Sequence, residues 1–223
     1  MDWQPILLSL KLAFITTLLL FLIAIPLANW LAKSKWKGKP VIEAFISLPL
    51  VLPPTVIGFY LLLALSPNNG LGAWLKNNLG LELIFSFEGL VLASMIYSLP
   101  FMVQPIHSAL AKLPNSLTEA SYVLGKSRWA TLLKVLLPNI KPALLTGIVL
   151  SFAHTIGEFG VVLMIGGNIP GETKVASIAI YDEVESLNYG AANTYSLVLL
   201  GLCFIILLSV YMFNGDHFKF NKE

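Results

Sequence analysis

The sequence contains few charged residues and a single cysteine. Charged residues make up 12% of its 223 positions and hydrophobic residues 57%, whereas soluble domains average about 25% and about 45 to 50%. This composition excludes an ordinary soluble domain and indicates a membrane protein. The net charge of +2 is too balanced for a protein that binds nucleic acid. Cys203 lies inside an apolar run and has no second cysteine to pair with, which excludes an internal disulfide.

The sequence also lacks the features of a cleavable signal peptide and of a boundary between domains. The segment from Met1 to Leu10 contains no Lys or Arg, and the apolar run 12–31 is longer than the core of a cleavable signal peptide. No internal repeat or low-complexity tract divides the chain. We therefore expect one membrane domain over residues 1–223.

Five apolar runs are long enough to cross a bilayer, which requires about 20 residues of α-helix. They cover residues 10–32, 42–65, 89–110, 142–165 and 194–213. We predict an all-α polytopic membrane protein with five transmembrane helices. No Lys or Arg lies deep in any span, since Lys11 falls near the edge of the first.

Basic residues are distributed unevenly between the two sides of these spans. One side holds only Lys76 and Lys174. The other side holds eleven basic residues: Lys33, Lys35, Lys37, Lys39, Lys112, Lys126, Arg128, Lys134, Lys141, Lys219 and Lys222. The positive-inside rule places these eleven in the cytoplasm. With five spans, the N-terminus is then outside, the C-terminus is inside, and the loop between the third and fourth spans is cytoplasmic.

This cytoplasmic loop contains residues that typically begin and end two short helices. Ser116 and Glu119 have the S-x-x-E spacing of a capping box. Gly125 is expected to end the first helix, Ser127 to cap the second, and Pro138 to follow its end. The apolar residues of the second helix are expected on one face: Trp129, Leu132, Leu133 and Leu136. Helices this short are not stable alone in water, so they need a surface to pack on.

Two of the spans contain residues that are unusual in a membrane. The second contains Pro49, Pro53 and Pro54, which remove N–H donors and bend the helix. We expect this segment near a translocation path, although a kink that only shapes packing is the alternative. The fourth has polar residues at i, i+3, i+4 and i+7: Ser151, His154, Thr155 and Glu158. Because polar groups are costly in hydrocarbon, this stripe is expected to face a solvated path or a dimer interface, or else a hydrogen-bonded seam between helices.

The segment from Gly166 to Thr173 has a superficial likeness to a phosphate-binding P-loop. Glu172 stands where the phosphate-binding lysine is required, and no strand precedes the glycines. The segment also lies on the outer side by the charge distribution. We therefore expect no nucleotide site in this chain.

One pattern in the cytoplasmic loop resembles a known family. The residues Glu119, Ala120, Ser121, Gly125, Val135, Leu137 and Pro138 follow E-A-A-x3-G-x9-I-x-L-P, with Ser121 and Val135 as small departures. This is similar to the EAA loop of ABC importer permeases. The resemblance implies that residues 111–141 form a coupling loop that docks on a cytoplasmic ATPase subunit. The alternative is an amphipathic hairpin that lies on the membrane surface.

Three further motifs resemble the molybdate branch of these permeases more closely than the sulfate branch. They are Gly157-Glu158-Phe159-Gly160, Asn168-Ile169-Pro170-Gly171-Glu172-Thr173 and Pro49-Leu50-Val51-Leu52-Pro53-Pro54. The resemblance implies the type I ABC importer permease fold and a homodimer in the cytoplasmic membrane of a prokaryote. It also implies two ATPase subunits and an external binding protein that delivers molybdate, or tungstate. The permease itself is then not an enzyme and needs no cofactor or metal.

Three alternatives are compatible with single features of the sequence. A sulfate permease would share the same coupling loop. A proton-coupled secondary transporter could use His154 and Glu158 as a relay, but it leaves the coupling-loop spacing unexplained. A membrane metalloenzyme could use the same two residues, but it lacks a third ligand nearby.

Overall fold

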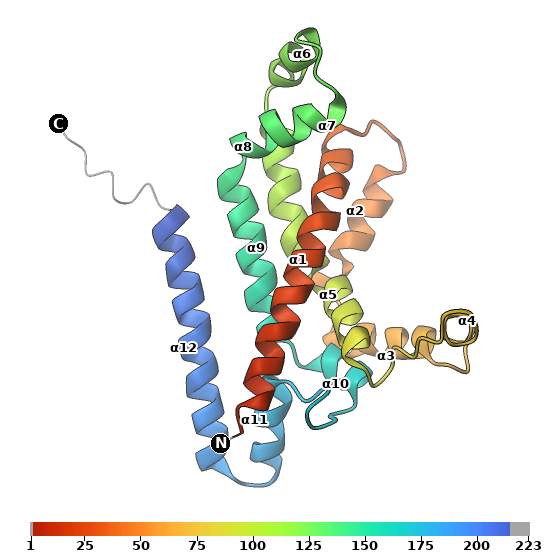
Figure 1. The fold of residues 1–223 in the computed structure, drawn as a ribbon, viewed down its shortest axis with the longest axis vertical. Helices are drawn as coiled ribbons and strands as arrows, with labels where there is room; N and C mark the ends of the chain where they lie inside the picture. Colours follow the sequence, from red (N-terminus) through yellow and green to blue (C-terminus); the bar gives the residue numbers. More distant parts are fainter. Residues whose placement is uncertain (1, 215–223) are drawn as a thin grey trace, which may run out of the picture.

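The computed structural model describes residues 2–214, and regular structure in that part of the chain is helical (Figure 1). The first half contains α1 (Gln4–Lys33), α2 (Lys39–Ser47), η1 (Leu48–Leu50), α3 (Pro54–Leu65), α4 (Gly70–Leu79) and α5 (Phe87–Lys112). The second half contains α6 (Asn115–Val123), α7 (Arg128–Thr131), η2 (Leu132–Leu136), α8 (Leu137–Asn139), α9 (Lys141–Ile156), α10 (Gly160–Gly166), α11 (Ala176–Glu185) and α12 (Tyr189–Asn214). The all-α prediction is confirmed.

The centre of the bundle is formed by α1, α5 and α9. The apolar runs of these helices meet in a core that includes Leu20, Met102, Ile106 and Leu136, each at most 2% exposed. Because lipid is as apolar as these side chains, close van der Waals packing, rather than removal from water, is the main favourable term between the helices. α5 continues through Pro100 and Pro105, because the bundle supports a long helix that proline alone would interrupt.

Three helices are long and apolar enough to cross a membrane as continuous elements: α1, α5 and the Tyr189–Ser209 part of α12. Two bent pairs raise the number of spans to five if each pair counts as one. The second expected span, 42–65, is broken between η1 and α3 with a bend of 112°. The other bent pair joins Arg128–Asn139 to α9 with a bend of 84°. The fourth expected span, 142–165, is divided between α9, which ends at Ile156, and α10, which starts at Gly160. The prediction of five spans is consistent with these elements, and the bend expected at the prolines of the second span is confirmed.

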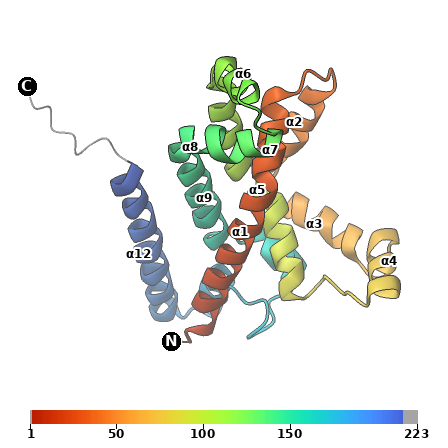
Figure 2. The same ribbon diagram turned by 45° about the horizontal axis from the view of Figure 1, so that its top comes forward.

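The bundle has two distinct ends. The N-terminal end of α1 and α11 lie at one end, and α6, α7 and α8 lie at the other (Figures 1 and 2). Most basic residues of the eleven occur where α1, α5 and α9 reach the α6 end. Lys219 and Lys222 lie outside the described residues. Which end faces the cytoplasm stays a prediction from the charge distribution.

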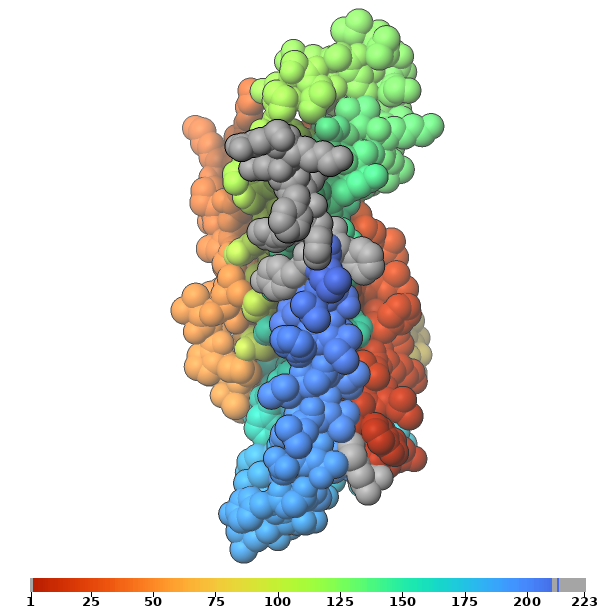
Figure 3. Space-filling model, turned by 90° about the vertical axis from the view of Figure 1, so that its left-hand side faces the viewer, coloured from red at the N-terminus to blue at the C-terminus, as the bar shows by residue number. Residues whose placement is uncertain are grey.

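The N-terminal part of the chain is connected by hydrogen bonds to the last two helices, α11 and α12, at the end opposite α6. The Ser9 hydroxyl accepts from the backbone N–H of Ala176 at 2.8 Å. The Tyr195 hydroxyl donates to the backbone oxygen of Asp2 at 2.8 Å and accepts from its N–H at 3.2 Å. From this connection α12 runs along the outside of the bundle (Figure 3), where few of its described side chains are buried.

Candidate functional site

The segment from Asn115 to Asn139, here called the coupling hairpin, projects from the end of the bundle (Figures 1 and 2). Its first helix, α6, ends in a Schellman motif. Gly125 has φ of +74°, its N–H donates to the oxygen of Tyr122, and the N–H of Lys126 donates to the oxygen of Ser121. Glycine adopts this left-handed conformation without strain, so the turn expected at Gly125 is confirmed.

The second helical segment starts at a side-chain cap. The Ser127 hydroxyl accepts from the N–H of Ala130 at 3.2 Å, as the sequence predicts. The capping box expected for the first helix is wrong. Because α6 starts directly after Pro114, Ser116 and Glu119 both lie inside the helix and neither caps it.

A buried pair of hydroxyl groups holds the two arms of the coupling hairpin together. The oxygen atoms of Ser121 and Thr131 are 2.8 Å apart, and both residues are at most 4% exposed. Ser121 is the position that departs from the second alanine of the E-A-A pattern. The hydroxyl added by this departure thus has a partner on the opposite arm, which sequence spacing alone does not reveal.

The second arm does not stop before Pro138 as the sequence suggests. A π-helical turn, η2, precedes this residue, and the N–H of Leu137 donates to the oxygen of Leu132. The wider turn relieves the clash that proline makes with the carbonyl four residues earlier, so helical geometry continues to Asn139. The four apolar residues expected on one face do not share one environment. Leu132 and Leu136 are buried in the core, whereas Trp129 and Leu133 are exposed.

The tip of the coupling hairpin presents apolar side chains to the surroundings. Val123 is 86% exposed, Leu124 77% and Trp129 63%. Glu119 and Ala120 are exposed on α6, Val135 and Leu137 are half-buried, and Pro138 is exposed. An exposed apolar patch of this kind is typical of a docking surface.

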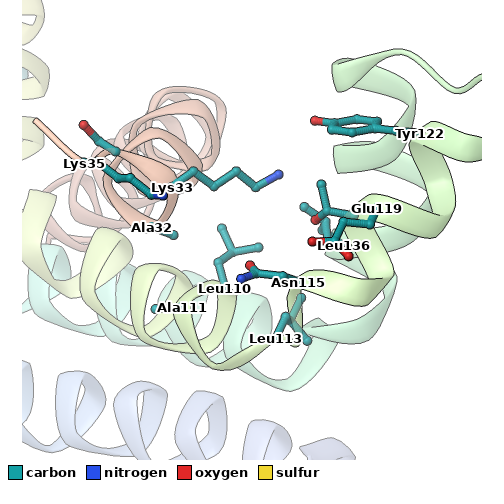
Figure 4. Close-up of a pocket in the computed structure, with 12 residues that line it drawn as sticks. Ala32, Lys33, Lys35, Leu110, Ala111, Leu113, Asn115, Glu119, Tyr122 and Leu136 are labelled. Atoms are coloured by element: carbon teal, nitrogen blue, oxygen red, sulfur yellow. The ribbon is translucent and has the colours of Figure 1, made fainter.

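A cleft of about 730 Å³ separates α6 from the ends of α1 and α5. Lys33 extends from the end of α1 toward Asn115 and Glu119 on α6 (Figure 4). No direct ion pair joins Lys33 to Glu119 within the described residues. The coupling hairpin is therefore attached mainly through Leu132, Leu136 and Ile140, which lie in the core.

A second cavity, of about 510 Å³, lies where the broken helices meet in the middle of the bundle. Its lining includes Pro54 and Thr55 from the start of α3, Tyr97 from α5, and His154, Glu158 and Gly160 from the break between α9 and α10. Gly160 is required there, because an added Cβ would lie 2.8 Å from the Cβ of Pro54. Of the other expected prolines, Pro53 is the cap of α3 and Pro49 is buried in η1.

The polar stripe of α9 does not face one common environment. Ser151 and Thr155 are at most 2% exposed, and Thr155 contacts Ser98 of α5 at 3.0 Å between the hydroxyl oxygens. Both residues are therefore buried inside the subunit. Thr155 takes part in a hydrogen-bonded seam with α5, the alternative interpretation of the stripe, whereas the Ser151 hydroxyl has no hydrogen-bond partner among the described residues. His154, in contrast, lines the cavity. Whether any of them contacts a transported ion stays a prediction.

Glu158 lies at the break and is held from two sides. Its Oε2 accepts from the hydroxyl of Ser94 at 2.7 Å, and its backbone oxygen accepts from Ser177 of α11 at 2.5 Å. The carboxyl group is 4% exposed, and Oε1 has no hydrogen-bond partner among the described residues. Glu158 and His154 are hydrogen-bonded to different serines, so the described contacts provide no direct relay between them.

Comparison with known proteins assigns the family. Residues 22–216 match the family described as the binding-protein-dependent transport system inner membrane component. This chain belongs to that family. The predictions of a permease subunit and of a location in the inner membrane are thereby confirmed.

Relatives within this family divide between two oxyanions. The chain is 44% identical to the molybdenum transport system permease protein ModB of Azotobacter vinelandii, over 94% of this chain and 93% of the relative. It is 33% identical to the probable sulfate transport system permease protein cysT of Chlorella vulgaris, over 96% of this chain and 80% of the relative. Both identities are high enough to share a fold, and the larger is with the molybdenum protein.

The fold is that of other permeases of the family. A bacterial alginate ABC transporter, solved in complex with an alginate pentasaccharide-bound periplasmic protein, has a chain with a TM-score of 0.77 to this structure and 18% identity. The match covers 97% of this chain and 79% of that chain. The expected type I ABC importer permease fold is confirmed.

The Asn168–Thr173 motif is a self-closed loop in this permease. The Thr173 hydroxyl donates to the oxygen of Gly166 at 2.7 Å and accepts from the N–H of Ile169 at 2.9 Å. Asn168 and Lys174 both contact the carboxylate of Asp182 on α11. Thr173 therefore has a structural role, and the sequence signal that could have indicated a tight loop is the spacing of Gly167 and Gly171, both of which have positive φ.

Proposed function

We propose that this chain is the permease subunit of an ATP-driven importer for molybdate, with tungstate as a second substrate. The 44% identity to a molybdenum permease over nearly the whole of both chains carries this assignment. The sulfate relative, at 33% identity, makes a sulfate permease the second candidate. Among the described residues no lysine or arginine lines the central cavity, so no permanent positive charge retains the anion there.

The coupling hairpin is the docking site for the ATPase in this proposal. Its tip exposes Val123, Leu124 and Trp129, and aromatic side chains of this kind are frequent anchors in protein interfaces. Residues 111–141 then form the coupling loop within a single membrane domain, 1–223. ATP binding and hydrolysis belong to the partner subunit, of which two copies are required.

A second copy of the permease completes the transport path. The central cavity is bordered by α3, α5 and the break between α9 and α10, and it is open on one side. A twofold axis would bring two such cavities face to face. An external binding protein then delivers the anion to the end of the bundle opposite the coupling hairpin. Movement of the docked hairpins would switch the path between inward-facing and outward-facing states as rigid bodies.

Uptake by cells that lack this chain tests the substrate. We expect loss of high-affinity molybdate uptake on deletion, recovery when the gene is restored, and competition by tungstate in recovered cells. If molybdate uptake survives deletion and sulfate uptake is lost instead, the chain is a sulfate permease.

The energy source separates the importer from a proton-coupled secondary transporter. We expect uptake to stop when ATP is depleted and to continue when the proton gradient is collapsed. The separate hydrogen bonds of His154 and Glu158 support this expectation, because a proton relay needs the two groups in contact directly or through water. The opposite result would favour the secondary transporter.

A further inference from the structure

His154 presents one ring nitrogen to the central cavity without a protein partner. Its imidazole lies against Phe101, with ring centroids 4.0 Å apart, and against Tyr97, with centroids 4.8 Å apart. The other ring nitrogen, Nδ1, is 2.9 Å from the hydroxyl oxygen of Ser98. Nε2 has no hydrogen-bond partner among the described residues, and the side chain lines the cavity.

The hydrogen bonds behind His154 decide which nitrogen carries the ring proton. Thr155 donates its single hydroxyl proton to the backbone oxygen of Ser151 at 2.9 Å. The proton between Thr155 and Ser98 therefore comes from Ser98. Since Ser98 has no second proton, it accepts from Nδ1–H of His154. In the neutral ring Nε2 is then a bare acceptor.

A bare acceptor and an oxyanion do not form a hydrogen bond, because both supply lone pairs. One added proton between Nε2 and an anion oxygen converts the contact into a charge-assisted hydrogen bond. The rings of Phe101 and Tyr97 pack against the imidazole. Because a buried ring does not carry a charge alone at low cost, the proton is taken up together with the anion. Thr55 and Tyr97 add hydroxyl groups to the same lining.

Two other titratable groups line the cavity beside His154. Tyr97 approaches from α5, and Glu158 approaches from the break between α9 and α10. Glu158 also belongs to the lining, but its carboxyl group accepts from Ser94 and the residue is only 4% exposed. α3 contributes Pro54 and Thr55, which carry no charge.

We propose that His154 is a substrate-binding residue that holds the oxyanion through a proton shared between Nε2 and an anion oxygen. The proton is taken up from the bulk solution together with the anion, and the resulting imidazolium offsets one of the two negative charges of the anion. This inference rests on the proposed function and names a binding group for it. Energy for transport still comes from ATP, and the proton only permits binding.

The pH dependence of uptake tests this proposal in the complete transporter. The permease, its ATPase and a molybdate-loaded binding protein are reconstituted in liposomes with ATP, and initial uptake of labelled molybdate is measured from pH 6 to pH 9. Binding-protein loading and ATPase activity are measured at each pH as corrections. We expect corrected uptake to fall by about tenfold per pH unit above the midpoint of the titration.

Three variants identify the group that titrates. His154→Gln, which cannot carry the proton, is expected to transport slowly and with no pH dependence. His107→Gln is the matched control, since His107 lies near Glu43 and outside the cavity, and it is expected to keep the parent profile. Ser98→Ala removes the acceptor of Nδ1–H and lets the neutral ring carry its proton on Nε2. We therefore expect it to extend uptake to higher pH.

Several results would overturn the proposal. A parent profile that is flat after correction excludes it, even if the His154→Gln variant fails to fold. A His154→Gln variant that binds its ATPase and keeps the parent profile also excludes it. A Ser98→Ala variant that lowers uptake equally at every pH would show that Ser98 does not set the ring proton. Absence of molybdate uptake by the parent at all pH values would refute the proposed function as well.

Discussion

Ser121 contributes a hydroxyl to the coupling hairpin that its alanine equivalent cannot supply. Its oxygen is 2.8 Å from that of Thr131, and Thr131 is fully buried. We expect Ser121→Ala to destabilise the permease by about 1 kcal/mol, because it leaves the Thr131 hydroxyl without this partner. Thermal unfolding of the purified permease measures the change.

Ser116→Ala is the matched control for this prediction, since Ser116 is exposed on the same helix. We expect no measurable change for it. The double variant Ser121→Ala with Thr131→Val should recover part of the lost stability, because both polar groups are then gone. If the double variant is less stable than the sum of the single changes, the pair does not interact as described.

Gly125 tests whether the turn of the coupling hairpin is needed for docking. Its φ is +74° and the space around an added Cβ is open, so a substitution introduces backbone strain without a clash. We expect Gly125→Val to weaken the turn by about 1 to 2 kcal/mol and to reduce co-purification of the ATPase. Gly125→Asn is the control, because asparagine tolerates this conformation better. Equal co-purification in both variants would show that the turn is not required.

Ser151 is fully buried, so a larger residue there is expected to disturb packing rather than to block a transport path. Ser151→Leu is expected to destabilise the subunit by about 1 to 3 kcal/mol through overpacking, rather than to obstruct transport in an assembled protein. Ser151→Ala is expected to assemble and to transport at nearly the parent rate. Yield and unfolding temperature of the two variants, with uptake, distinguish this from a path-lining role.

Residue roles that depend on local chain geometry could be predicted from the sequence. Gly125 and Ser127 are examples, because a left-handed turn and a helix cap involve neighbours within five residues. The partners of His154 and Glu158 could not be predicted, since Ser98 and Ser94 are 56 and 64 positions away. The same holds for Ser121, whose partner lies on the other arm of the hairpin.

At the scale of elements, the exposed tip of the coupling hairpin predicts an interface. Trp129 is 63% exposed on α7, beside the turn that ends α6. We expect Trp129→Ala to weaken binding of the ATPase by about 30-fold, which corresponds to about 2 kcal/mol for an aromatic anchor. Affinity measured with the detergent-solubilised permease gives this value.

Trp74→Ala is the control for an exposed tryptophan, because Trp74 lies on α4, away from the coupling hairpin (Figure 1). It should bind the ATPase as the parent does. Parent-like affinity of the Trp129→Ala variant would place the ATPase on another part of the surface.

The apolar runs predicted three elements well and two less well. α1, α5 and α12 follow from length and hydropathy alone. The prolines at positions 53 and 54 predicted a bend, but neither its size of 112° nor its direction, because both depend on how α3 packs against α10. The end of α9 at Ile156 also depends on contacts from α5 and α11 to Glu158.

At the scale of the whole molecule, the orientation in the membrane can be measured with single cysteines. Cys203→Ser gives a background without cysteine. In right-side-out vesicles we expect Asn68→Cys to react with a membrane-impermeant maleimide and Ser116→Cys to react only after permeabilisation. The opposite pattern would reverse the assignment of the two ends.

The connection of the N-terminal residues to α11 and α12 has a consequence for biosynthesis. Ser9 pairs with a residue 167 positions later, and Asp2 pairs with one 193 positions later. At about 5 to 20 residues per second, a ribosome needs roughly 8 to 40 seconds to produce these partners. During that interval the start of α1 is already synthesised but lacks its final contacts. The nascent permease therefore depends on the insertion machinery, or on other proteins nearby, to shield this end until translation is nearly finished.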